Sequence, residues 1–172
     1  RGLTETKTLA GVDEILRAAG DSFDGKRVVV SGSGNVALYA IEKVQQLGGT
    51  VVACSDSDGY LIDDNGLDLA QLKDLKEVRR ERLSAYVSDT AQHSTDGSIW
   101  QVPCDVALPC ATQNELTGRD AKTLVEHGVG LVAEGVAGLV GHSVALVADA
   151  THNLSDVLGL AIAWGGAEGA DV

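Results

Sequence analysis

Residues 25–37 read GKRVVVSGSGNVA, in which a β-branched apolar run is followed by closely spaced glycines. The run at 27–31 has the pattern of a strand that is covered on both faces. Gly32, Gly34 and Ala37 then follow the spacing G-x-G-x-x-A of a dinucleotide-binding turn. In such a turn the first glycine permits a tight bend, the second lets the backbone approach a pyrophosphate, and the small third residue lets helix and strand pack closely. The stretch therefore predicts a strand, a phosphate-binding turn and the start of a helix.

The residues that follow complete a βαβ unit. Helical periodicity runs through 35–47 and stops at Gly48, and residues 50–55 form a second apolar β-branched run. Two such strands joined by a helix imply a parallel pair with a right-handed crossover. The helix N-terminus provides an anion site, and Asp56 stands near the spacing expected for an acid that binds a ribose. The alternative interpretation is a βα turn with a structural role only.

Three further segments follow the second strand. Residues 59–67 alternate weakly around the sequence DDNG, which is typical of a hairpin. Residues 69–87 carry one apolar face and predict a single long helix. The polar residues 88–97 are expected to form a loop.

The rest of the chain continues the pattern of an α/β domain. We expect an N-terminal helix within 1–21, a strand at 105–108, short helical turns at 114–127 and a fourth strand at 130–133. The predicted fold class is α/β, a Rossmann-like doubly wound parallel sheet over residues 22–135. A helical, apolar C-terminal appendage of different origin is predicted at 136–172.

The composition excludes some classes of function. With 13 basic and 25 acidic side chains, the formal net charge of the 172 residues is −12, which argues against binding nucleic acid. Cys54, Cys104 and Cys110 are odd in number and lack CxxC spacing, which argues against a disulfide framework and a zinc site. No methionine occurs, so we expect a fragment or a processed chain.

Long segments of the chain resemble the nucleotide-binding domain of bacterial NADP-dependent glutamate dehydrogenases. The segments that carry this resemblance are 25–37, 54–59 (CSDSDG), 75–80 (LKEVRR), 96–100 (DGSIW), 104–116 (CDVALPCATQNEL) and 132–135 (VAEG). The resemblance implies NADP rather than NAD as cofactor and a homo-oligomer in the full-length enzyme. The cysteine pattern, for its part, favours reduced thiols and a cytoplasmic location.

The resemblance also implies a role for each matching position. Residues at the glycine-rich turn would face the pyrophosphate, namely Gly32, Ser33, Gly34, Asn35 and Val36. Ser55 and Asp56 would lie at the adenine ribose, with Lys76 as a candidate for the 2′-phosphate. Residues bordering the nicotinamide ribose would be Ala111, Thr112 and Gln113. From spacing alone, an exposed position on a solvated helix face explains Lys76 and Arg79 as well as a role in phosphate binding does.

The chain also departs from that family. Residues 3–11 (LTETKTLAG) differ from the family segment that precedes the glycine-rich turn. The family's catalytic lysine and aspartate belong to an earlier, glutamate-binding domain, which these residues do not include. The resemblance therefore implies an NADP(H)-binding fragment of an enzyme that interconverts L-glutamate and 2-oxoglutarate, inactive by itself.

Residues 134–166 resemble a different family, the first two membrane helices of cation diffusion facilitators. The match centres on the sequence SVALVADATHNLSD at 143–156. His152 and Asp156 are four apart, so they share a helix face with Asp149 nearby, and a histidine with carboxylates suits Zn²⁺. The alternative function is therefore a fragment of a zinc transporter, with residues 128–166 in a membrane. An ordinary amphipathic helix with a solvated polar stripe explains the same spacing.

Overall fold

The computed structural model describes residues 13–14, 16–18, 20–112 and 115–132. Within them lies a six-stranded sheet with the strand order β4-β3-β2-β1-β5-β6. The strands are β1 (Arg27–Val30), β2 (Thr50–Asp56), β3 (Gly59–Ile62), β4 (Gln92–Ser94), β5 (Val106–Leu108) and β6 (Leu131–Val132). β1 pairs in parallel with β2 and β5, and β5 pairs in parallel with β6. This confirms the α/β class and the βαβ unit.

The sheet is mixed, so the prediction of an all-parallel sheet is wrong on one side. β3 runs antiparallel to both β2 and β4. The cause is the short connection between β2 and β3, because parallel strands need a crossover of a dozen or more residues. Here only Ser57 and Asp58 separate the two strands, and the Asp58 N–H donates to Asp56 Oδ1 at 2.9 Å.

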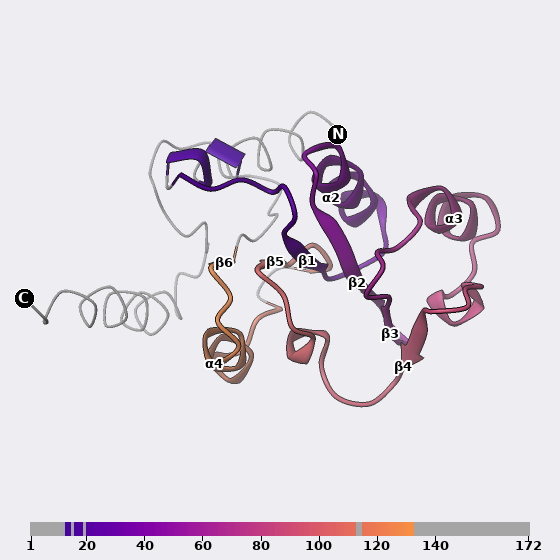
Figure 1. Ribbon diagram of the computed structural model, residues 1–172. Coiled ribbons are helices and arrows are strands. Elements are labelled where there is room, and N and C mark those ends of the chain that lie inside the picture. Colours follow the sequence, from indigo (N-terminus) through magenta and orange to yellow (C-terminus); the bar gives the residue numbers. More distant parts are fainter. Residues whose placement is uncertain (1–12, 15, 19, 113–114, 133–172) are drawn as a thin grey trace, which may run out of the picture.

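Helices cover both faces of the sheet (Figure 1). The α-helices are α2 (Asn35–Gln46), α3 (Leu69–Lys73) and α4 (Gly118–Glu126). Valines of β1 alternate between the two faces, so that Val28 and Val30 pack beneath α2, whereas Val29 packs on the side of α4.

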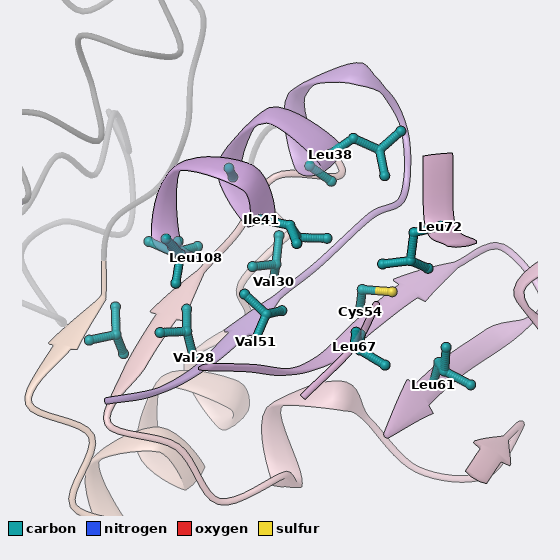
Figure 2. Close-up of a cluster of buried hydrophobic side chains, with 14 of the residues drawn as sticks. Val28, Val30, Leu38, Ile41, Val51, Cys54, Leu61, Leu67, Leu72 and Leu108 are labelled. Atoms are coloured by element: carbon teal, nitrogen blue, oxygen red, sulfur yellow. The ribbon is translucent and has the colours of Figure 1, made fainter. Parts of the chain in front are cut away.

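The core on the α2 side is built almost entirely from aliphatic side chains (Figure 2). Val30, Ile41, Val51 and Leu72 are fully buried in it. Each such side chain contributes roughly 1.5–3 kcal/mol relative to an exposed one. This packing fixes helix α2, and with it the glycine-rich turn that precedes the helix.

The prediction of a single helix over 69–87 is wrong. α3 passes into one π-helical turn, η1 (Asp74–Val78), and a short 3-10 helix, η2 (Leu83–Ala85), follows. The predicted apolar face fails at Val78, whose side chain is 73% exposed, and Arg80 breaks the helix with a φ of 56°. A contact distant in sequence then fixes the chain, because the Leu83 N–H donates to Asp56 Oδ2 at 2.8 Å.

The prediction of a hairpin centred on the DDNG sequence at 63–66 is also wrong, because no strand follows this turn directly. The turn comes after β3 and returns the chain toward β2, where the Leu67 N–H donates to Val51 O at 2.9 Å. Asp63 builds this turn, since its Oδ1 accepts from the Asn65 N–H at 2.9 Å. The expected loop at 88–97 contains β4, an edge strand of polar residues that no apolar alternation could reveal.

Other predictions are confirmed with small changes of boundary. The strands at 105–108 and 130–133 are β5 and β6, and the helical turns at 114–127 are α4. Of the predicted N-terminal helix, residues 13–14 and 16–18 are helical and the rest lies outside the described residues. The C-terminal appendage at 136–172 also lies outside them.

Candidate dinucleotide-binding site

The glycine-rich turn connects β1 to α2. Gly32 has a φ of 83°, a conformation that favours glycine. A Cβ on Gly32 would lie 3.0 Å from the Ala111 Cα, so this glycine also permits close contact between two loops. Gly34 differs, because a Cβ there would meet no heavy atom of the described residues within 4 Å. The protein's own packing therefore does not require glycine at position 34, and the space beside it is open to a ligand.

The N-terminus of α2 is suited to an anion. Gly34 is the N-cap, no side chain in the described part of the chain caps the helix, and the first turn carries no acidic residue. The first N–H groups of a helix lack partners within it and lie at the positive end of the helix dipole. This 12-residue helix therefore presents unsatisfied donors beside the open space at Gly34.

The turn lies where the order of the strands reverses. From β1 the chain proceeds through β2, β3 and β4 on one side, and then returns to β5 on the other side. Ligands of open α/β sheets bind outside the carboxyl ends of the strands at such a switch point. The two loops that border this point begin at Ser31, after β1, and at Pro109, after β5.

Ser31 joins these two loops. Its Oγ accepts from the N–H groups of Cys110 and Ala111, at 2.8 and 3.3 Å, and donates to Glu115 Oε1. Ser31 is only 2% exposed. Neither Ser31 nor Glu115 was predicted as a site residue, because more than eighty residues separate the two and no local pattern joins them.

The carboxyl end of β2 brings Ser55, Asp56 and Lys76 together. Ser55 Oγ accepts from the Gly32 N–H at 2.8 Å, which ties the end of β2 to the glycine-rich turn. The Asp56 side chain is only 4% exposed. Its Oδ2 accepts from the Leu83 N–H and lies 3.6 Å from Lys76 Nζ. The predicted ribose-binding acid therefore also has structural partners within the chain.

The surroundings of Lys76 are more basic than the sequence pattern predicted. Lys76 Nζ also donates to Glu81 O at 2.9 Å, and the Lys76 side chain is 17% exposed. Arg82 was missed: its guanidinium contacts Ser57 Oγ and lies 3.4 Å from Asp58 Oδ2. The basic run at 79–82 was the available signal, but the expected long helix placed it on a solvated face.

The remaining predicted residues are only partly placed. Ala111 and Thr112 are exposed beside the glycine-rich turn, and Gln113 lies outside the described residues. The proposed metal ligands Asp149, His152 and Asp156 also lie outside them. Among the residues described, no group of three or more His, Cys, Asp or Glu side chains could hold a metal ion. No helix in that part of the chain is long and apolar enough to cross a membrane.

The cysteines have unreactive surroundings. Burial raises the pKa of Cys54 to about 12 and that of Cys104 to about 11. Burial, followed by the negative charge of Glu115, raises the pKa of Cys110 to about 12. Because the thiolate is the reactive form, these thiols are poor nucleophiles at neutral pH.

A glycine-rich turn at the switch point of a sheet with a parallel βαβ unit defines the class of Rossmann-like domains. A family model described as Glutamate/Leucine/Phenylalanine/Valine dehydrogenase matches residues 3–143. The chain belongs to this family.

Individual relatives agree with this assignment. The chain is 53% identical over 125 residues to an NADP-specific glutamate dehydrogenase of Haemophilus influenzae, covering 70% of this chain and 28% of the relative. It is 46% identical over 132 residues to an NADP-specific glutamate dehydrogenase of Helicobacter pylori, covering 72% and 30%. The chain thus spans less than a third of the length of these relatives.

Solved structures show the same fold. The crystal structure of Plasmodium falciparum glutamate dehydrogenase matches with a TM-score of 0.74 and 39% identity, covering 78% of this chain and 30% of that one. The hetero-hexameric glutamate dehydrogenase from Thermus thermophilus has a TM-score of 0.60 and 23% identity, a likeness of fold alone. A second family model, the cation efflux transmembrane domain, matches residues 124–168, most of which lie outside the described residues.

Proposed function

We propose that residues 22–135 form the NADP(H)-binding part of a glutamate dehydrogenase. The observation that carries this proposal is the open, uncapped N-terminus of α2 beside Gly34, at the switch point of the sheet. Relatives named NADP-specific glutamate dehydrogenase support the choice of cofactor and substrate. In the whole enzyme, hydride would move between the nicotinamide and 2-iminoglutarate, in the oxidative deamination of L-glutamate or the reverse reductive amination of 2-oxoglutarate.

The pyrophosphate is assigned to the glycine-rich turn. Backbone N–H groups at the start of α2 would donate to its oxygens, and the helix dipole would favour its negative charge. The residues assigned to this contact are Gly32, Ser33, Gly34, Asn35 and Val36. Because Gly34 leaves open space on its exposed side, the pyrophosphate can approach the backbone closely.

The 2′-phosphate of NADP is assigned to the region around Lys76 and Ser55. An acid at the end of β2 normally favours the free ribose hydroxyl of NAD and repels a phosphate. Here Asp56 is largely buried and accepts from the Leu83 N–H, while Lys76 lies 3.6 Å away. Lys76 offsets the charge of Asp56, and Arg82 adds an exposed cation near Ser57.

The nicotinamide half is assigned to the loop after β5. Ala111, Thr112 and Gln113 would border the nicotinamide ribose, since Ala111 packs against Gly32 at the switch point. The substrate and the catalytic lysine and aspartate would come from a glutamate-binding domain outside these residues. We therefore expect this chain to bind cofactor without turnover, and the whole enzyme to be an oligomer in the cytoplasm.

Calorimetric titration of the full chain with NADPH and NADH tests this function. We expect binding of NADPH, weaker binding of NADH, and no glutamate-dependent reduction of NADP⁺. The variant Ser55→Glu should weaken NADPH more than NADH, because the added carboxylate would repel the 2′-phosphate. Absence of NADPH binding by the folded chain would refute the proposal, and equal losses in Ser55→Glu would refute the assigned ribose pocket.

The C-terminal segment has a second candidate function. The match of the cation efflux family model to residues 124–168 favours a different origin for 136–172, as part of a membrane transporter. Carbonate extraction of the expressed chain tests this directly. Retention in the membrane fraction would support a spanning segment, whereas complete release would count against it.

A further inference from the structure

The hydroxyl of Ser31 has all of its hydrogen-bonding capacity in use. A serine hydroxyl offers one donor and two acceptor lone pairs. The lone pairs accept from the N–H groups of Cys110 and Ala111, so the hydrogen must point elsewhere, and Glu115 Oε1 accepts it. This hydrogen bond therefore fixes one carboxylate oxygen of Glu115 in position.

This arrangement places a carboxylate beside the loop that borders the nicotinamide. Ser31 Oγ contacts Glu115 on one side and the Ala111 N–H, at 3.3 Å, on the other. Through Ser31 Oγ, two consecutive hydrogen bonds connect Glu115 Oε1 to the Ala111 N–H. The Cys110 thiol lies in the same loop, and its pKa is raised first by burial and then by the negative charge of Glu115.

We infer that Glu115, held by Ser31, makes this site favour the oxidised cofactor NADP⁺ over NADPH. This inference rests on the proposed NADP(H) site. The nicotinamide ring carries one positive charge in NADP⁺ and none in NADPH, whereas the rest of the cofactor is the same. At a separation of the order of 10 Å, a fixed carboxylate would favour the cationic form roughly three- to tenfold, at effective dielectric constants of about 20–40 after partial screening.

The test compares dissociation constants for NADP⁺ and NADPH in the full chain and in Glu115→Gln. Glutamine retains an oxygen that can accept from Ser31 but removes the charge. We expect the ratio Kd(NADP⁺)/Kd(NADPH) to rise roughly three- to tenfold in Glu115→Gln. Glu126→Gln is the matched control, because it removes an exposed carboxylate of α4, and its ratio should not change.

The outcomes separate this inference from the proposed function. If the unaltered chain binds both forms but the ratio in Glu115→Gln stays within about twofold, the inference is wrong and the cofactor site stands. If the unaltered chain binds neither form, both are wrong. Glu115→Leu provides a second neutral variant should Glu115→Gln fail to fold. Ser31→Ala should weaken both forms, because it leaves two backbone N–H groups without their acceptor. It should also raise the ratio, because Glu115 loses the donor that positions its carboxylate, and an unchanged ratio would refute this role of Ser31.

Discussion

Replacing Gly34 by aspartate should strengthen helix α2 and remove nucleotide binding at the same time. Gly34 is the N-cap of α2, with extended backbone angles (φ −80°, ψ −171°) that any residue can adopt. A Cβ there meets no heavy atom within 4 Å among the residues that the structure places, so the aspartate fits without displacing these neighbours. Its carboxylate can accept from an N–H of the first turn and interact favourably with the helix dipole, which should raise the free energy of unfolding by about 0.5 kcal/mol.

The same carboxylate would stand where the pyrophosphate is assigned. Two negative charges about 5 Å apart repel each other by about 3 kcal/mol at an effective dielectric constant of about 20. The aspartate would also occupy N–H groups that the pyrophosphate needs. We therefore expect the Kd for NADPH to rise at least about 100-fold.

Urea denaturation and calorimetric titration measure the two effects in the same preparation. The matched control is Gly118→Asp, at the start of α4, where a Cβ also meets nothing within 4 Å. This control should leave NADPH binding unchanged. A Gly34→Asp variant that is folded and binds NADPH as tightly as the unaltered chain would refute the assignment of the pyrophosphate to this turn.

Three further predictions concern the 2′-phosphate site, the hydrophobic core and the buried Cys54. Arg82→Ala and Lys76→Ala should each weaken NADPH binding by about five- to tenfold while affecting NADH less; equal losses for both cofactors would contradict the 2′-phosphate assignment. Leu72→Ala should lower the free energy of unfolding by about 2–5 kcal/mol in urea, because this fully buried side chain fills the core beneath α3; a loss below about 1 kcal/mol would contradict that packing. Because the pKa of Cys54 is raised to about 12, the folded chain keeps this proton after the unfolded chain loses it. The free energy of unfolding should therefore fall above about pH 8.5, by about 1 kcal/mol per pH unit for this thiol, and Cys54→Ala should fall less steeply in denaturation between pH 8 and 10.

Local patterns were enough to predict the centre of the fold. The β-branched run of β1, the glycine spacing and the periodicity of α2 all lie within about twenty residues, and each part supports the others. The predicted helix therefore matches α2 (Asn35–Gln46) to within one residue. The same reasoning found β5, β6 and α4, where short apolar runs are bounded by turns.

The predictions failed where contacts distant in sequence decide the structure. Asp56 binds the N–H of Leu83, and no pattern within 69–87 indicates that the helix must break to allow it. The contact of Ser31 with Glu115 also could not be predicted, since it joins residues 84 positions apart. β4 pairs only at the edge of the sheet, so its polar residues carry no period that distinguishes a strand from a loop.

The most direct test of the cofactor site is amide hydrogen exchange with and without NADPH. We expect slower exchange for residues 32–38 at the start of α2 and for residues 109–112 of the facing loop. Residues 118–126 of α4, on the other face of the sheet, should exchange at unchanged rates. Protection confined to α4 or absent from 32–38, at saturating NADPH, would contradict a dinucleotide site at the glycine-rich turn.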